Sequence, residues 1–165
     1  MIHLYCGEGK GKTTAAMGLA LRMAGRGGRV VIAQFLKSAD SGERAALAHV
    51  PGVTLLEIPE HIKFTFAMNE EERRQTAEQC RALLEQVSAV RCDMVVLDEV
   101  CAALTCGLLE KEPLLTLLDR GGPEFVLTGR DPLPELEARA HYITCCGKVR
   151  HPYDTGTPAR AGVEY

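Results

Sequence analysis

The sequence predicts an α/β protein in which a mainly parallel β-sheet carries helices on both faces. Short apolar runs alternate with helical patterns along the chain, and this alternation favours parallel strands joined by crossover helices. Three runs lead into residues that suit ion binding: 7–14, Asp98-Glu99 and Gly129-Arg130. Ligands bind such sheets at the carboxyl ends of the strands. We therefore expect these three segments to meet at one edge of the sheet.

The first elements follow from local patterns. Helix 13–24 is rich in Ala, Leu and Met and is ended by Gly25. Residues 29–35 are almost continuously apolar, as in parallel strands buried on both faces. The turn Pro51-Gly52 introduces a strand at 53–58.

The longest expected helix covers residues 69–90. Asn69 can cap it, and Glu72 completes a capping box. The preceding segment, 59–68, is expected to be irregular, and the tail, 148–165, to be an ordered loop. The expected strands are 2–6, 29–35, 53–58, 93–99, 124–130 and 141–145, and the expected helices are 13–24, 42–49, 69–90, 101–108, 110–118 and 133–139.

Length and composition indicate one domain over residues 1–165. Hydrophobic residues make up 46% of the chain and charged residues 25%, as in soluble globular proteins. The net charge of −3 provides no attraction for nucleic acid or an anionic membrane. No apolar run approaches the roughly 20 residues of a transmembrane helix, and no signal peptide precedes the first strand. We expect a cytoplasmic protein without nucleic-acid or membrane partners.

A phosphate-binding loop is predicted between the first strand and the first helix. Backbone amides and the helix N-terminus would surround phosphate oxygens. Lys12 would neutralise phosphate charge, and the Thr13 hydroxyl would hold Mg²⁺. Cys6 departs from the usual pattern, which has its first glycine at that position. The predicted phosphate-binding residues are Gly7, Glu8, Gly9, Lys10, Gly11, Lys12, Thr13 and Thr14.

Charged residues at other strand ends add to this prediction. Asp98 and Glu99 match the acids that support Mg²⁺ beside a triphosphate; the alternative is a pair of acids that merely ends a strand. Either acid could bind the metal directly or through water. Arg130 could clamp phosphate or ribose oxygens, as could Arg22, for which a solvated helix face is the alternative.

Two aromatic residues and the cysteines need separate interpretations. Phe64 and Phe66 would point the same way in an extended segment, and the pattern alone favours packing beneath a loop. None of the seven cysteines forms a C-x-x-C pair, so we expect reduced, structural thiols rather than a zinc site. Adjacent Cys145-Cys146 is the alternative redox-active candidate.

Taken together, these segments resemble the P-loop-type ATP:corrinoid adenosyltransferases. The resemblance rests on 7–16, Gly18 to Arg22, Val31 to Lys37, Gly42-Glu43, Phe64-Thr65-Phe66, Val95 to Glu99, Leu127 to Arg130, and the tail from Val149 to Tyr153 and from Gly162 to Tyr165. It implies a P-loop NTPase architecture of the RecA-like type. It also implies transfer of the 5′-deoxyadenosyl group of ATP to the cobalt of a reduced, Co(I) corrinoid, with release of triphosphate, in adenosylcobalamin biosynthesis or salvage.

The resemblance assigns roles to individual residues. Lys12 would hold the leaving triphosphate, while the nucleotide would lie reversed in the loop with C5′ towards the corrinoid. Cys6, which replaces the first glycine of the usual loop pattern, is consistent with this reversed orientation. Phe64 and Phe66 would displace the lower axial ligand of cobalt, with Phe66 replacing the family's Trp. Mg²⁺ (or Mn²⁺) would be the metal. A homodimer and a reduced flavoprotein as electron donor are further implications, and segment 59–68, the tail or a second subunit would cover the corrinoid.

Two other functions stay open at this point. An ordinary P-loop hydrolase or kinase would use Glu99 to position water or a hydroxyl. A non-catalytic corrinoid- or ATP-binding protein would explain the change at Phe66. The sequence does not identify the preferred corrinoid.

Overall fold

A computed structural model describes residues 1–59 and 61–163. Glu60 of the segment 59–68 and Glu164-Tyr165 of the tail lie outside the described residues. The strands are β1 (Ile2–Cys6), β2 (Val30–Gln34), β3 (Val53–Leu55), β4 (Met94–Asp98), β5 (Glu124–Thr128) and β6 (Tyr142–Cys145). The helices are α1 (Lys12–Ala24), α2 (Gly42–Leu47), α3 (Glu70–Ala89), α4 (Val100–Thr105), α5 (Lys111–Arg120) and α6 (Pro134–Glu137), with 3-10 turns η1 (Thr65–Ala67) and η2 (Pro152–Thr155).

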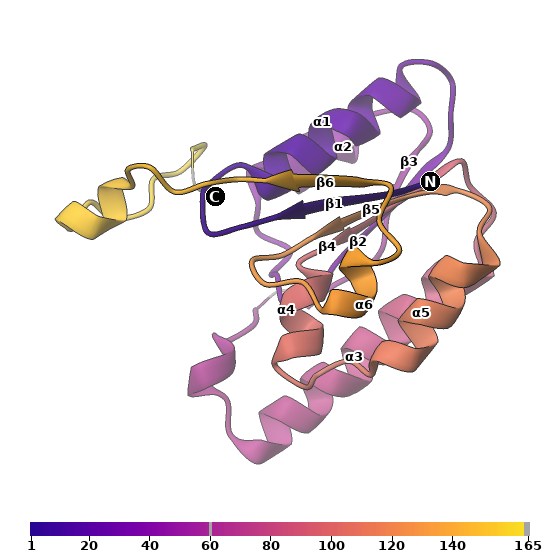
Figure 1. Cartoon of the computed structure of the whole chain (residues 1–165). Coiled ribbons are helices and arrows are strands. Elements are labelled where there is room, and N and C mark those ends of the chain that lie inside the picture. The colour runs from indigo at the N-terminus through magenta and orange to yellow at the C-terminus, as the bar shows by residue number, and fades with distance from the viewer. Residues whose placement is uncertain (60, 164–165) are drawn as a thin grey trace.

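The six strands form one parallel sheet in the order β3-β2-β4-β5-β1-β6. Helices α1 and α2 lie over one face, and α3, α4, α5 and α6 over the other (Figure 1). This confirms the predicted α/β class and its parallel sheet. Because β1 is placed between β5 and β6, the loop after β1 lies beside segments from the end of the chain.

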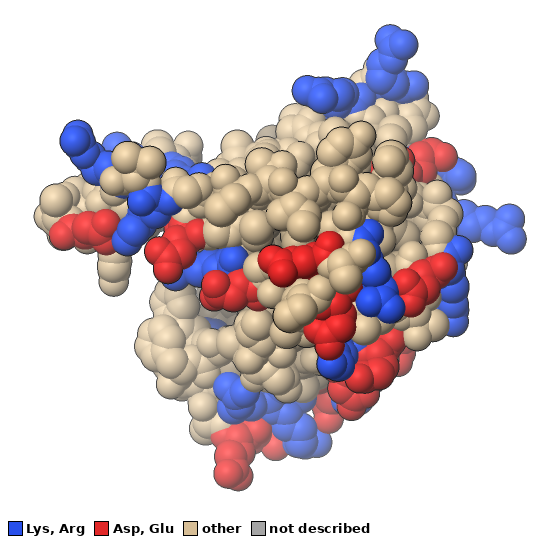
Figure 2. All heavy atoms as spheres, viewed as in Figure 1, with Lys and Arg blue, Asp and Glu red and all other residues tan. Residues whose placement is uncertain are grey.

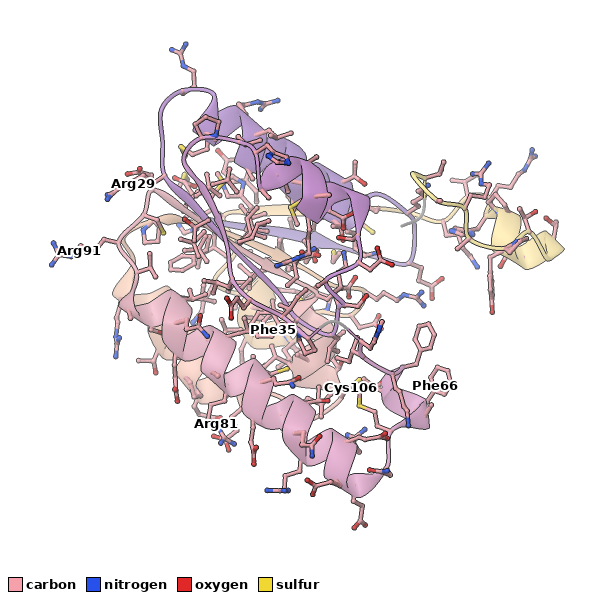
Figure 3. The ribbon with its side chains drawn as sticks, turned by 180° about the vertical axis from the view of Figure 1, so that it is seen from behind. Arg29, Phe35, Phe66, Arg81, Arg91 and Cys106 are labelled. Atoms are coloured by element: carbon pink, nitrogen blue, oxygen red, sulfur yellow. The ribbon has the colours of Figure 1, made fainter. Side chains whose placement is uncertain are left out.

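Two apolar layers hold the helices to the sheet. The smaller layer joins Ala16, Met17 and Ala20 of α1 to β2, β4 and β5. The larger layer packs α3, α4, α5 and α6 against the opposite face, and Phe35 is fully buried within it (Figure 3). Residues 30–34 and 94–98 are buried along their whole length, as expected for central parallel strands.

The element boundaries differ from the prediction at a few places. β3 ends at Leu55 rather than at residue 58; the amide of Leu56 still donates to the carbonyl of Ile32, but the chain then leaves the sheet before Pro59, which has no amide hydrogen. The irregular segment 59–68 contains the turn η1, and the tail contains η2.

The cysteines are free thiols, as predicted. Burial raises the pKa of Cys80 to about 11 and that of Cys101 to about 12, so both are neutral, apolar fillers. In the described part of the chain, no group of three or more His, Cys, Asp or Glu side chains could hold a metal ion. Cys145 is exposed and Cys146 is half-buried.

The capping box predicted for α3 is present. The Glu72 amide donates to Asn69 Oδ1 at 2.8 Å, and the Asn69 amide donates to Glu72 Oε2 at 2.9 Å. These bonds satisfy two amides at the helix start. They also fix where α3 begins.

We predict that Asn69→Ala lowers the free energy of unfolding by about 1 kcal/mol, because the first turn of α3 loses its cap. Urea denaturation measures the change. Gln79→Ala, an exposed position inside the same helix, is the control; equal effects of the two substitutions would contradict the capping role.

Candidate active site

A cavity of about 610 Å³ opens where β1, β2, β4 and β5 end. Its volume is within the range of small-molecule sites. The tail reaches back to it. The lining residues are Glu8, Gly9, Lys10, Gly11, Lys12, Thr13, Thr14, Met17, Lys37, Gly42, Glu43, Glu99, Arg130, His151, Gly162 and Val163.

The loop after β1 is fixed by backbone bonds to the end of the chain. Gly7 adopts φ 93°, so the left-handed turn falls one residue after Cys6, which stays in the strand. The Gly7 amide donates to the Arg130 carbonyl at 2.9 Å, and the Gly9 amide to that of Cys146 at 2.7 Å. A Cβ at Gly9 would lie 2.6 Å from the Cys146 carbonyl oxygen. Only glycine allows this close approach.

Lys12 begins α1 and its side chain is buried inside the loop. Its ammonium donates to the carbonyls of Gly7 at 2.6 Å and Gly9 at 2.8 Å. No side chain caps α1, and the first amides of a helix have no acceptor within the helix. The loop thus presents a positive helix end and a fixed ammonium to the cavity.

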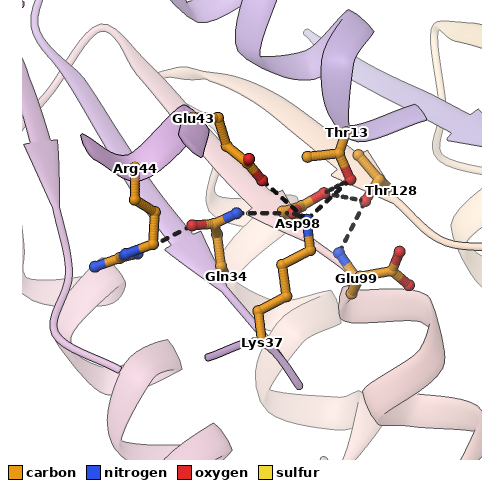
Figure 4. Close-up of polar contacts among 8 residues, drawn as sticks. All are labelled: Thr13, Gln34, Lys37, Glu43, Arg44, Asp98, Glu99 and Thr128. Carbon is orange, nitrogen blue, oxygen red and sulfur yellow. Dashed lines mark hydrogen bonds and ion pairs between the residues drawn. The ribbon is translucent and has the colours of Figure 1, made fainter. Parts of the chain in front are cut away.

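Asp98 is fully buried and is the centre of the polar network at the end of β4 (Figure 4). Its Oδ1 accepts from the hydroxyls of Thr13 at 2.9 Å and Thr128 at 2.7 Å. Its Oδ2 accepts from Gln34 Nε2 at 3.1 Å and from Lys37 Nζ at 2.8 Å. Such partners offset the cost of burying a carboxylate. The contacts join α1, β2, β4 and β5.

Lys37 follows β2 and points its ammonium into this network. Besides Asp98, its Nζ contacts Thr13 Oγ1 at 3.2 Å and Glu43 Oε1 at 3.4 Å. Burial acts to lower the pKa of Lys37, but Asp98 and Glu43 outweigh it, so the pKa is raised and the ammonium stays charged. Leu36, the preceding residue, has φ 53°, a left-handed conformation that costs free energy in a residue other than glycine.

Glu99 also has a left-handed backbone, with φ 59°. Its amide donates to the Thr128 hydroxyl at 2.8 Å, and its side chain lines the cavity. Burial, and then the charge of Asp98, raise the pKa of its carboxyl group. Leu36 and Glu99 are the positive-φ residues other than glycine in residues 1–59 and 61–163, and both are at this site.

The oxygens at the site fit Mg²⁺. The Thr13 hydroxyl and the Asp98 carboxylate are hard oxygen donors in contact with each other, and Glu99 lines the same cavity. The Asp98 carboxylate already holds one cation, the Lys37 ammonium. Few protein ligands are available, which suits Mg²⁺ because it keeps several waters and shares the oxygens of its nucleotide.

Most of the predicted phosphate-site residues meet at this cavity, including Arg130, whose side chain lines it. Arg22 does not. It lies in the last turn of α1, about 15 Å along the helix axis from Lys12, and it lines a separate hollow with His3 and Tyr142. The structure therefore favours the solvated-face alternative for Arg22.

Phe64 and Phe66 are exposed to 76% and 87%, and their rings stack with centroids 5.5 Å apart. Packing beneath a loop, the interpretation that the pattern alone favoured, is therefore wrong. Phe66 projects outwards from η1, near Cys106 (Figure 3). Figures 1 and 3 both place η1 and the tail at the edge where the strands end.

Sequence reasoning gave no role to four polar residues of the network. They are Gln34, Lys37, Glu43 and Thr128. Gln34 and Thr128 end buried strands, and a polar residue at the end of an apolar strand was the signal that could have identified them. The Arg44 guanidinium donates to Gln34 Oε1 at 3.0 Å and orients its amide.

The parallel sheet, the glycine-rich loop before α1 and the acids at the end of β4 define a P-loop nucleotide-binding protein. The family described as "ATP:corrinoid adenosyltransferase BtuR/CobO/CobP" matches residues 1–165. The chain belongs to this family.

Individual relatives agree with this membership. "Corrinoid adenosyltransferase CobA" of Salmonella typhimurium is 30% identical over 177 residues, which cover all of this chain and 85% of the relative. The corrinoid adenosyltransferase of Pseudomonas aeruginosa is 30% identical, with all of this chain and 83% of the relative covered. That of Escherichia coli K12 is 29% identical, with 85% of the relative covered.

Two surface features bear on partners. Among the described residues, every helix is too short or too polar to cross a membrane. Figure 2 shows basic and acidic side chains interspersed over the visible face rather than gathered into one patch. This distribution gives a nucleic-acid backbone no continuous basic surface on that face.

We predict that Glu99→Gln stabilises the metal-free protein at neutral pH. The raised pKa means that ionisation of Glu99 destabilises the folded state. The stability that neutral Glu99 contributes is present below the pKa of the unfolded state, near 4.5, and is lost as the pH rises through the pKa of the folded state. The gain should therefore be seen at about pH 7.5 and vanish near about pH 4. Urea denaturation in chelator measures it.

The exposed substitution Glu85→Gln on α3 is the control, for which we expect no such pH-dependent gain. A Glu99→Gln protein that is less stable than wild type at neutral pH would contradict the assignment.

Proposed function

We propose that this protein transfers the 5′-deoxyadenosyl group of ATP to the cobalt of a Co(I) corrinoid and releases triphosphate. Family membership supports the reaction. The structural observation that carries it is an exposed, stacked pair of aromatic rings on the same edge as a phosphate-binding cavity. Large exposed apolar groups mark binding surfaces, and a flat macrocycle suits such a pair.

The residues of the cavity would serve a reaction whose nucleophile is the substrate itself. Co(I) attacks C5′, the C5′–O bond breaks, and the electron pair leaves with the triphosphate. No protein base is required for this step. Lys12, the loop amides and the N-terminus of α1 stabilise the leaving charge, while Arg130 clamps phosphate or ribose oxygens.

Mg²⁺ would neutralise further charge on the triphosphate when bound at Thr13, Asp98 and Glu99. The carboxylate of Asp98 orients the Thr13 hydroxyl through the 2.9 Å bond. Glu99 lines the cavity and would act directly or through water. Mn²⁺, which accepts the same oxygen donors, would serve in place of Mg²⁺.

Phe64 and Phe66 would lie beneath the corrinoid and exclude the lower axial ligand of cobalt. Axial ligation tunes the potential of a metal, so its loss makes reduction to Co(I) easier. Segment 59–68 and the tail would cover the substrate, and a second copy of the chain would complete the cover in a homodimer. We further propose a cytoplasmic location and a reduced flavoprotein as electron donor.

Anaerobic incubation with ATP, Mg²⁺ and chemically reduced cobalamin tests the reaction. We expect a light-sensitive cobalt–carbon bond by absorbance and one inorganic triphosphate for each bond formed. Orthophosphate as the product would instead favour a hydrolase or kinase. Binding of ATP and cobalamin without a new cobalt–carbon bond would favour a non-catalytic binding protein.

We predict that Phe66→Ala slows adenosylation from cob(II)alamin by about tenfold or more, and from chemically prepared cob(I)alamin by much less, because axial-ligand exclusion matters mainly for reduction. Parallel rate measurements from the two starting states check this. Val90→Ala, another exposed apolar truncation, is the control. Equal losses from both starting states would exclude the axial-ligand role.

A further inference from the structure

The Lys37 ammonium contacts three oxygens, two of which, those of Asp98 and Thr13, belong to the set that would bind Mg²⁺. The three contacts are 2.8 Å to Asp98 Oδ2, 3.2 Å to Thr13 Oγ1 and 3.4 Å to Glu43 Oε1 (Figure 4). These oxygens come from β4, α1 and α2, so the ammonium bridges three elements.

A divalent cation and this ammonium exclude each other. Mg²⁺ binds oxygen at about 2.0–2.1 Å, and a metal bound to the Thr13 hydroxyl would lie within a few ångströms of Nζ at its present position. Two like charges at that separation repel strongly in a partly buried site. The Lys37 side chain is only 25% exposed, so solvent screens little of this repulsion.

We propose that Lys37, which Glu43 also holds, competes with Mg²⁺ for the oxygens of Thr13 and Asp98, so that the metal enters only together with a triphosphate. This rests on the proposed function, which supplies the triphosphate. The phosphate oxygens would provide partners for both cations, since Lys37 and the phosphate-binding loop line the same cavity. The ammonium then turns from the carboxylates to the phosphates.

The competition has a chemical purpose. A site that bound metal without nucleotide would bind whichever divalent cation has the highest affinity for its oxygens, because such affinities follow a fixed order among the metals. The Lys37 ammonium keeps the buried Asp98 neutralised without a metal. Specificity for the metal–nucleotide complex follows from one lysine.

Mn²⁺ binding without nucleotide, followed by the electron paramagnetic resonance signal of free Mn²⁺, tests the proposal. Wild type should bind Mn²⁺ only weakly, and Lys37→Met should bind it at least about tenfold more tightly, since the competing charge is gone. Lys37→Gln serves if Lys37→Met does not fold. Lys111→Met, which removes the lysine of the exposed Glu135 pair, is the control and should match wild type.

Two results would overturn the proposal. One is a dissociation constant of the wild-type protein for Mn²⁺ of about 10 µM or below in the absence of nucleotide. This measurement does not depend on a variant. The other is a folded Lys37 variant that binds Mn²⁺ no more tightly than wild type. Neither measurement involves corrinoid or adenosyl transfer. Failure of the proposed function would appear in the product assay instead.

Discussion

The buried carboxylate of Asp98 is the interaction on which the site depends. It has no exposure to solvent, so its charge is stabilised only by the groups around it. Those groups come from α1, β2, β5 and the segment after β2. The same bonds that satisfy the charge therefore set the positions of the phosphate-binding helix and of three strand ends. Fold and site are held by one network.

A fixed loop and two residues with strained backbone conformations surround that network. The phosphate-binding loop is tied by backbone bonds to residues 130 and 146. Leu36 and Glu99 keep left-handed conformations that cost free energy, and their strands are fixed by the sheet on both sides. The side chains of Phe64 and Phe66, in contrast, are exposed to solvent. The cavity at the strand ends is preformed, while the aromatic pair proposed to contact the corrinoid forms an open surface.

Much of the fold was predictable because parallel strands and crossover helices have strong local patterns. The phosphate-binding loop and Asp98-Glu99 were predictable for the same reason, as each is a contiguous motif. The exposure of Phe64 and Phe66 was not, because alternation in an irregular segment does not say which face is covered. The contacts of Lys37 were not predictable either, because they join residues of three separate elements. The distance of Arg22 from Lys12 was predictable, because Arg22 lies ten residues further along the expected helix, which is about 15 Å.

The bond from the Gly9 amide to the Cys146 carbonyl has a consequence for the order of folding. The amide of Gly9, near the start of the chain, pairs with the carbonyl of Cys146, directly after β6. A segment synthesised early therefore completes its bonds with one synthesised late. Contacts of such high sequence separation slow folding. A nascent chain lacking β6 would still have the Gly7–Arg130 bond and the two Lys12 contacts, but it would lack the acceptor of the Gly9 amide. The binding loop thus reaches its full set of backbone bonds only after residue 146 has been synthesised.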